Sequence, residues 1–254
     1  SGLLCLGYAW RRFPLLRMEK RHWTFDWSYA WKHLRLALPM AMQFVITGIS
    51  VLVNQAVLNL FGSAAVAAFS AASKIHMLSE QVAVSFGTAM ATYAGQNYGA
   101  GKVGRVREGL RKCALACEGF TLGIMVIITA FGGVMSSWFI DGYHPEVIHQ
   151  AHLYLFISAL FYPALTMLFL YRNTLLGLGN GVTPMLAGVC ELLSRMIGAP
   201  VLGHFFGFTG LCWINPIAWV TASGLLFLSY RKTMRNIRSV DPTVDASDSN
   251  KTMN

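Results

Sequence analysis

Long stretches without a charged side chain are the feature of this sequence that most restricts its fold. Asp, Glu, Lys and Arg are absent from residues 36–73, 119–140, 147–171 and 196–230. A helix needs about 20 consecutive apolar residues to cross the hydrocarbon of a bilayer. Apolar residues make up 55% of the chain and charged residues only 12%, more apolar surface than one water-soluble core of this length can bury. The sequence therefore predicts an all-α, polytopic membrane protein.

Glycine and proline residues divide the apolar stretches into separate helices, because they favour the ends and restarts of helices. Six transmembrane helices are expected, at residues 36–60, 64–93, 110–139, 145–176, 182–206 and 211–230. Residues 36–230 are thus predicted to form one six-helix lobe.

The segments on either side of the lobe have a different character. Residues 1–10 are apolar but too short to span, and we interpret them as the end of a truncated transmembrane helix. Residues 11–35 form a basic linker in which tryptophans recur every fourth residue, predicting a short interfacial helix from Thr24 to His33. Residues 231–254 are polar towards their end, and we expect a disordered tail there.

Basic residues are distributed unevenly between the two ends of the expected helices. Of the 20 lysines and arginines, 18 fall in segments on one side, counting Arg172 in the turn after the fourth span. Only Lys74 and Arg195 lie inside spans. Cytoplasmic segments carry this excess, so both ends of the chain are expected in the cytoplasm, with the protein in the plasma or inner membrane. The net charge of +9 then reflects topology, and the expected partner is the lipid bilayer instead of nucleic acid.

The second expected helix is the least lipid-like, because polar residues recur along one of its faces. These residues fall within an arc of about 60° when placed at about 100° each; they are Ser70, Lys74, Gln81, Ser85, Thr88 and Thr92. Contacts between helices explain such Ser and Thr residues as well as a solute pathway does. Lys74 is harder to explain in that way, because it lies near the expected bilayer midplane. We expect this face to line the lobe interior or a cleft towards a second lobe.

Charged residues inside the spans complete the set of candidate pathway residues. Glu80 lies beside the polar face and is a candidate to bind a cation or to pair with Lys74. Glu191 and Arg195 are one helical turn apart near the midplane, and we predict that they make contact. The expected solute or ion pathway comprises Lys74, Glu80, Gln81, Ser85, Glu191, Arg195, Gln43 and Asn54.

Other reactive residues fit a structural explanation better than a catalytic one. Cys113 and Cys117 share a helical face but lack the further ligands that a zinc site needs. His144, Glu146, His149 and His152 cluster where the fourth helix begins, a weak candidate for a metal site. The sequence shows no serine–histidine–acid set, phosphate loop or Cys-x-x-Cys pair, so we expect neither an enzyme nor a bound metal or cofactor.

Three segments, taken together, resemble the multidrug and toxic compound extrusion (MATE) family. The segment Gly95-Gln96-Asn97-Tyr98-Gly99-Ala100-Gly101 is similar to a helix-ending motif of that family. The segment from Arg172 to Gly179 resembles its Arg-x-x-Leu-x-Gly-Leu-Gly turn, and Glu191-Leu192-x-x-Arg195 and Pro39 also fit. The resemblance implies two six-helix lobes with both ends cytoplasmic, of which this chain is the C-terminal lobe and lacks its N-terminal partner.

The same resemblance implies export of drug-like, often cationic, small molecules coupled to inward flow of Na⁺ or H⁺. One branch of the family has a glutamate in the first helix of this lobe, but the matching residues 44–48 contain no acid. A lipid-linked sugar flippase shares the fold and is the alternative, although it would need more intramembrane cations than Lys74 and Arg195. A membrane enzyme and a non-catalytic scaffold are further alternatives.

Overall fold

A computed structural model describes residues 2–14, 25–140, 142 and 144–240 of the chain. The chain divides into two compact units, residues 1–35 and residues 36–254, which are described separately. In the first unit, α1 (Gly2–Arg12) is helical, and the rings of Trp27 and Trp31 stack with their centroids 6.4 Å apart.

The predicted interfacial helix is not a separate element. Residues from Trp27 onwards are helical, but they form the start of α2 (Trp27–Asn59), which continues into the first span without a break. The reason is local, because no glycine or proline interrupts the helix-favouring sequence before Pro39. Thr24 lies outside the described residues.

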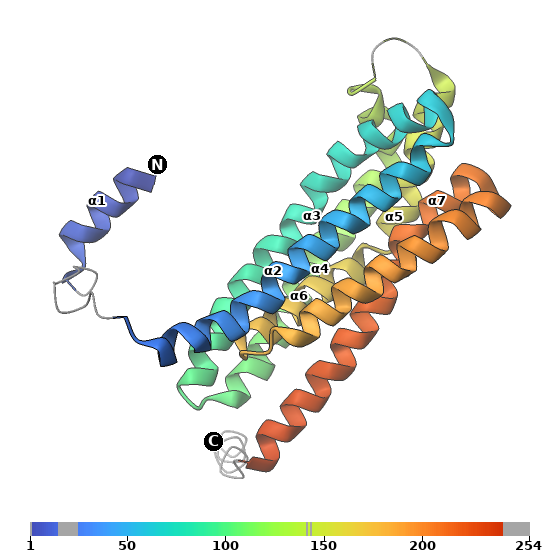
Figure 1. Cartoon of the computed structure of the whole chain (residues 1–254). Helices are drawn as coiled ribbons and strands as arrows, with labels where there is room; N and C mark the ends of the chain where they lie inside the picture. The colour runs from blue at the N-terminus through green and yellow to red at the C-terminus, as the bar shows by residue number, and fades with distance from the viewer. Residues whose placement is uncertain (1, 15–24, 141, 143, 241–254) are drawn as a thin grey trace, which may run out of the picture. The chain divides into compact units, whose positions relative to one another are not determined.

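The second unit consists of helices only in its described residues. They are the rest of α2, then α3 (Gly62–Gly99), α4 (Val103–Ser137), α5 (Pro145–Leu160), α6 (Tyr162–Gly177) and α7 (Val182–Val240). These helices run alongside one another, and successive turns lie at alternate ends of the bundle (Figure 1). The all-α fold predicted from the sequence is confirmed.

Two breaks in the helices can be compared with the expected spans, one inside α7 and one between α5 and α6. At Gly207 the backbone of α7 is non-helical, with φ 60° and ψ −143°, so α7 contains the fifth and sixth expected helices. The fourth expected helix is not continuous, because α5 and α6 meet at Phe161 with a bend of 53°. Pro163 in the first turn of α6 has no N–H to donate to the preceding turn, which accounts for the break.

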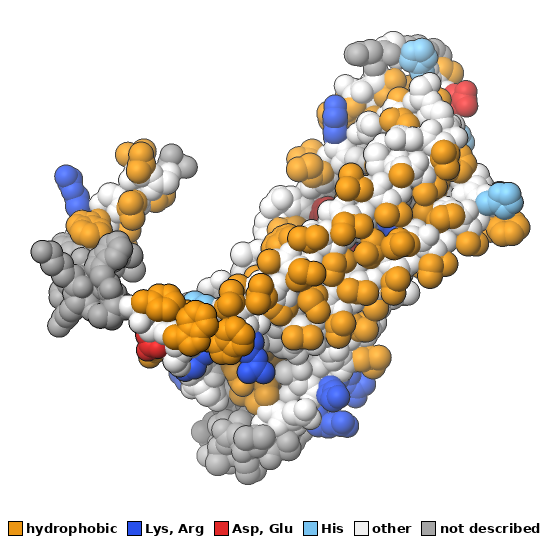
Figure 2. Space-filling view, viewed as in Figure 1, with side chains coloured by type: hydrophobic (Ala, Val, Ile, Leu, Met, Phe, Trp, Pro, Cys, Tyr) orange, Lys and Arg blue, Asp and Glu red, His pale blue; other side chains and the backbone are white. Residues whose placement is uncertain are grey.

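Three of the described helices, α2, α4 and α7, are long and apolar enough to cross a membrane, and the bent α5–α6 pair makes a fourth candidate. Figure 2 shows apolar side chains spread along the visible face of this unit. Exposed apolar residues of α2 include Leu38, Met42 and Leu52. Such a surface suits contact with lipid.

Small residues allow α3 and α6 to approach closely at the centre of the bundle. The buried face of α3 consists largely of Ala68, Ala72, Ala83 and Ala94. Opposite it, a Cβ on Gly177 would lie only 2.4 Å from the carbonyl oxygen of Ala91. This contact is typical of membrane helices, which pack through small residues.

The first ten residues of the expected disordered tail are helical. Residues 231–240 continue α7, and Met234 is 4% exposed. The side chain of Met234 packs in the main core cluster, which stabilises the helix beyond the last apolar span. Residues 241–254 lie outside the described part of the chain.

Candidate functional site

A cavity of about 540 Å³ lies among the helices of the second unit. Helical spacing explains its lining, because residues three or four apart share one face of a helix. On α2 the lining residues include Gln43, Thr47 and Asn54; on α3 they include Ser73, His76, Glu80 and Thr88; α5, α6 and α7 contribute Tyr154, Arg172, Asn173, Glu191, Arg195, Asn215 and Trp219. A mainly apolar cavity of this size, with several polar and charged side chains converging on it, is a candidate solute site.

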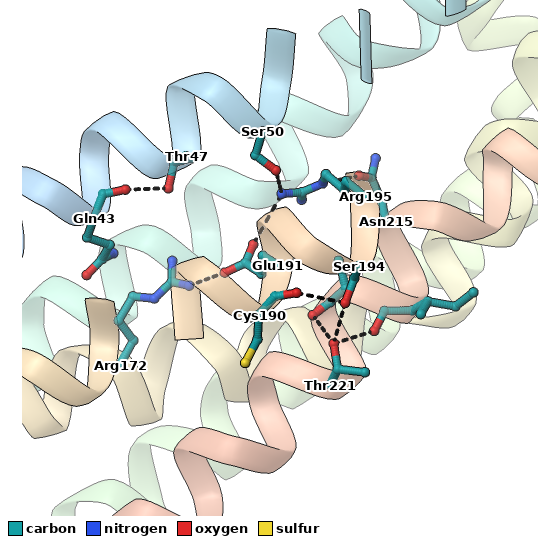
Figure 3. A network of polar contacts seen from close by, with 12 residues as sticks. Gln43, Thr47, Ser50, Arg172, Cys190, Glu191, Ser194, Arg195, Asn215 and Thr221 are labelled. Carbon is teal, nitrogen blue, oxygen red and sulfur yellow. Dashed lines mark hydrogen bonds and ion pairs between the residues drawn. The ribbon is translucent and has the colours of Figure 1, made fainter. Parts of the chain in front are cut away.

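The centre of the polar lining is Glu191 on α7, which contacts two arginines. Its Oε2 lies 3.6 Å from Nη1 of Arg195, so the predicted pairing of Glu191 with Arg195 is confirmed. Its Oε1 accepts a hydrogen bond from Nη2 of Arg172 on α6 (Figure 3). Each side chain in this group is about nine-tenths buried.

Arg172 was wrongly placed by the sequence analysis, which counted it in a turn at the end of the helix. The structure has it inside α6, five residues before the end of the helix at Gly177, with only 8% of its surface exposed. Ion pairing with Glu191 makes this burial tolerable. The cavity therefore contains two intramembrane cations, neither of which is Lys74.

Arg195 donates two further hydrogen bonds, one to α2 and one to a later part of α7. Its Nη1 donates to Oγ of Ser50 on α2 at 2.7 Å, and its Nε donates to Oδ1 of Asn215 at 3.2 Å. Asn215 in turn donates from Nδ2 to the hydroxyl of Tyr154 on α5 at 2.9 Å. These bonds fix the guanidinium and link α2 to α7, as Figure 3 shows for Ser50 and Arg195. The bond from Asn215 to Tyr154 adds α5 to the network.

Arg172 has fewer partners than Arg195. Its Nε is buried, and no hydrogen-bond acceptor lies within reach of it among the described residues. The guanidinium carbon also lies 5.7 Å from the centre of the Phe169 ring, a cation–π contact. The Nε donor of Arg172 is therefore unused and enclosed by protein atoms.

His76 is a site residue that the sequence analysis missed. It stacks on Trp219 at 5.4 Å between ring centroids, and its Nδ1 lies 3.0 Å from the Tyr162 hydroxyl. Its Nε2 is 3.8 Å from Oε2 of Glu80, one helical turn further along α3. The i, i+4 spacing that identified Glu191 and Arg195 would also have identified His76 and Glu80.

The candidate pathway residues fall into two groups. The cavity is lined by Gln43, Asn54, Glu80, Glu191 and Arg195, but not by Lys74, Gln81 or Ser85. The polar face of α3 that contains the latter three is exposed on the surface of the unit, and of its six residues Thr88 lines the cavity. The alternative that was predicted with the lobe interior, a cleft towards a second lobe, stays a prediction.

Local hydrogen bonds explain how the hydroxyls on this exposed face are satisfied. Ser85 and Thr88 donate to the carbonyls of Gln81 and Val84, one turn earlier in the same helix. The Nζ of Lys74 lies 5.2 Å from the centre of the Phe139 ring. Hydroxyls that bond to their own helix need no partner helix and no water.

The remaining reactive residues form no metal site within the described part of the chain. In the middle of α5, His152 packs against Gly132, and its Nε2 lies 3.4 Å from the carbonyl oxygen of Thr129. Cys113 and Cys117 are free thiols, and Cys117 is fully buried in the core.

Apolar helices around an open cavity that contains a buried, charge-paired network are typical of a membrane protein of the transporter class. The MatE family profile matches residues 39–201, more than half of the chain. The chain therefore belongs to the MatE family, as the resemblance in its sequence indicated.

Related proteins and solved structures agree with this assignment. The chain is 28% identical to YpnP, a probable multidrug resistance protein of Bacillus subtilis, over 85% of the chain and 45% of YpnP. It is 23% identical to an FAD transporter of Shewanella oneidensis, over 76% of the chain and 42% of that protein. The bent form of the Vibrio cholerae MATE transporter VcmN superposes with a TM-score of 0.80 at 20% identity, over 93% of the chain and 53% of VcmN. The chain thus spans about half the length of these relatives.

Proposed function

We propose that this chain is the C-terminal lobe of a twelve-helix exporter that moves drug-like organic compounds, often cationic, out of the cell. Its match to about half of a MATE transporter and of a probable multidrug resistance protein supports this proposal. The missing N-terminal lobe would complete the solute pathway. The chain acts in transport and not in catalysis.

The observation that carries the proposal is the charge-paired network that lines the cavity. Glu191, Arg172 and Arg195 are held in a membrane lobe where charged side chains are costly, so they are expected to serve the passage of a solute. With Gln43, Asn54 and Glu80, they offer both hydrogen-bond donors and acceptors to a substrate.

The coupling ion of the proposed exporter is Na⁺ or H⁺. Glu80 is the acidic side chain of the cavity that has no arginine within 4.0 Å in the described structure, and we propose it as the lobe's coupling residue. The basic segments at one end of the lobe support cytoplasmic ends in an inner or plasma membrane.

Burial of Arg172 favours a second candidate, the lipid-linked sugar flippase. A flippase has to hold phosphates, and the cavity contains two arginines where the sequence analysis placed one. The similarity to an FAD transporter points in the same direction, because FAD also carries phosphates.

Transport by the full-length protein that contains this lobe would distinguish the two. It would be expressed in a bacterial host that lacks its own drug exporters, and everted membrane vesicles would be loaded with organic cations under a Na⁺ or a proton gradient. We expect gradient-dependent drug accumulation in the vesicles and increased drug resistance in the cells. Flipping of a fluorescent lipid-linked sugar without any drug transport would support the flippase instead.

A further inference from the structure

His76 on α3 is a titratable side chain of the cavity lining to which the proposed function assigns no role. Its imidazole ring packs against two aromatic side chains, with its centroid 5.4 Å from that of Trp219 and 5.4 Å from that of Tyr162. Only 13% of the side chain is exposed. An imidazole held in this way has little freedom to rotate, so the directions of its two ring nitrogens are fixed.

The partners of the two nitrogens determine which one carries the hydrogen. Nε2 lies 3.8 Å from Oε2 of Glu80, one turn further along α3, and an ionised carboxylate can only accept a hydrogen bond. In the neutral ring Nε2 therefore carries the hydrogen, and Nδ1 is left as an acceptor. Nδ1 lies 3.0 Å from the hydroxyl of Tyr162, which can donate to it. The contacts thus form one directed chain from Tyr162 through His76 to Glu80.

The charge balance of the cavity supports a neutral His76. The charged side chains of the lining are two of each sign, contributed by α3, α6 and α7; they are Glu80, Arg172, Glu191 and Arg195. Among the described residues, α5 adds the phenol of Tyr154 to the lining, α2 adds only side chains that do not titrate, and α4 adds none. A cationic His76 would therefore add a net positive charge to a neutral, partly buried set, which is costly.

The surroundings of Glu80 suit a proton better than a sodium ion. Helix α3 is unbroken from Gly62 to Gly99, so the backbone carbonyls beside Glu80 accept hydrogen bonds within their own helix. Transporters coordinate Na⁺ through the carbonyls of unwound helices, which this segment does not offer. The N–H of His76 would also repel a metal cation at the carboxylate, whereas a proton needs only one carboxylate oxygen.

We propose that His76 is a positioning residue that directs its Nε2–H at the Glu80 carboxylate, and that Glu80 therefore exchanges protons instead of Na⁺. The inference rests on the proposed function, in which Glu80 is the coupling residue. A small rotation of the Glu80 side chain, 35% of which is exposed, closes the 3.8 Å separation to a hydrogen bond. This bond favours the ionised carboxylate. A proton then moves from a hydronium ion in the cavity to an oxygen of Glu80, leaving water and a neutral carboxylic acid, and the reverse step returns it.

The protonation of Glu80 can be measured directly in the full-length protein in lipid nanodiscs. Infrared difference spectra recorded against pH follow the C=O stretch of protonated carboxyl groups, and the part of this band that is missing in Glu80→Gln belongs to Glu80. The pH midpoint of that part is compared between the wild type and variants of His76. Each titration is carried out once in sodium chloride and once in choline chloride.

Two variants of His76 separate positioning from packing and from proton carriage. His76→Gln can make both bonds, because its amide oxygen accepts from Tyr162 and its amide N–H donates to Glu80. His76→Phe keeps a ring against Trp219 but has no donor. We expect His76→Gln to retain the wild-type midpoint and His76→Phe to raise it by about one pH unit or more, the effect of one hydrogen bond to a charged group. Replacing choline by sodium should leave every midpoint unchanged.

Matched controls come from residues of the same types on α5 and α6. His152→Gln and His152→Phe change a histidine that lies outside the cavity lining and should leave the midpoint unchanged. Tyr162→Phe removes the donor to Nδ1 and should raise the midpoint, by less than His76→Phe does. Tyr171→Phe changes a tyrosine of the same helix whose ring packs against Phe227, and it should have no effect. Tyr162→Phe keeps the test decisive if His76→Phe fails to fold.

The outcomes distinguish this inference from the proposed function. Equal midpoints in the wild type, His76→Phe and Tyr162→Phe would overturn the inference, as would a midpoint that falls in sodium. An equal shift in His76→Gln and His76→Phe would also overturn it, because the imidazole itself would then carry the proton. Uptake of ethidium into proteoliposomes under a pH gradient tests the function separately. The expected midpoints without any such uptake would support the positioning of Glu80 and contradict export, and uptake with equal midpoints would refute this inference alone.

Discussion

Arg195 on α7 donates a hydrogen bond of 2.7 Å from Nη1 to Oγ of Ser50 on α2, although the two residues are 145 positions apart in the sequence. Ser50 is completely buried, whereas most of the surrounding surface of α2 is exposed. This hydrogen bond is therefore one of the few specific contacts that attach α2 to α7 beside the cavity.

Removing the Ser50 hydroxyl should weaken that attachment. Ser50→Ala leaves one donor of Arg195 without its acceptor, and we expect the unfolding free energy to fall by about 1–3 kcal/mol. The change would be measured as a lower melting temperature of the purified full-length protein in detergent. Thr47→Ala is the control, because the Thr47 hydroxyl donates to Gln43 within α2 itself. Equal melting temperatures for wild type and Ser50→Ala would contradict the prediction.

Loss of the charge on Glu191 should have a larger effect. Glu191→Gln leaves Arg172 and Arg195 buried without their counterion, which is expected to cost about 3–5 kcal/mol. The abundance of the protein in the membrane and its melting temperature should both fall. Glu146→Gln removes an exposed carboxylate at the start of α5 and should change neither quantity. Normal abundance and melting of Glu191→Gln would show that Glu191 does not stabilise the lobe.

The sequence was sufficient to predict the all-α fold and the pair on α7, because both depend on local patterns. Apolar run length and glycine breaks define the helices, and i, i+4 spacing brings Glu191 and Arg195 together. The contact between Arg172 and Glu191 depends instead on how α6 packs against α7. No local pattern reports that packing, so Arg172 was placed in a turn.

The polar face of α3 is exposed in this lobe, so its position in a cleft towards a second lobe stays a prediction. Within the lobe, polarity does not mark the buried face of this helix. In this bundle the buried face of α3 contains alanines and glycines, because small residues let α6 approach closely. Hydroxyls such as that of Thr88 bond to their own helix and do not need to be buried.

The close approach of α3 and α6 makes Gly177 sensitive to substitution. A Cβ at this position would lie 2.4 Å from the Ala91 carbonyl oxygen and 3.0 Å from Cβ of Ala94, so one helix has to shift. We expect Gly177→Ala to destabilise the protein by about 1–3 kcal/mol, measured by thermal unfolding in detergent. Gly119→Ala has open space around its Cβ and should be neutral or stabilising by up to about 1 kcal/mol. Equal stabilities of the two variants would exclude the steric explanation.

Transport activity should distinguish Glu80 from Lys74, which the sequence analysis expected to matter together. Glu80 lines the cavity and lies 3.8 Å from His76, whereas Lys74 lies over the Phe139 ring and does not line the cavity. We expect Glu80→Gln to reach the membrane in normal amounts but to lose gradient-driven transport. Lys74→Met should retain most of the wild-type activity per molecule.

The measurement is drug uptake into everted vesicles, divided by the amount of transporter determined by immunoblot. This normalisation separates a role in transport from a role in stability, because a purely structural role would lower abundance and leave activity per molecule unchanged. Wild-type activity per molecule in Glu80→Gln would remove Glu80 from the pathway. Loss of activity in Lys74→Met at normal abundance would instead show that the exposed polar face of α3 takes part in transport, for example where it meets the N-terminal lobe.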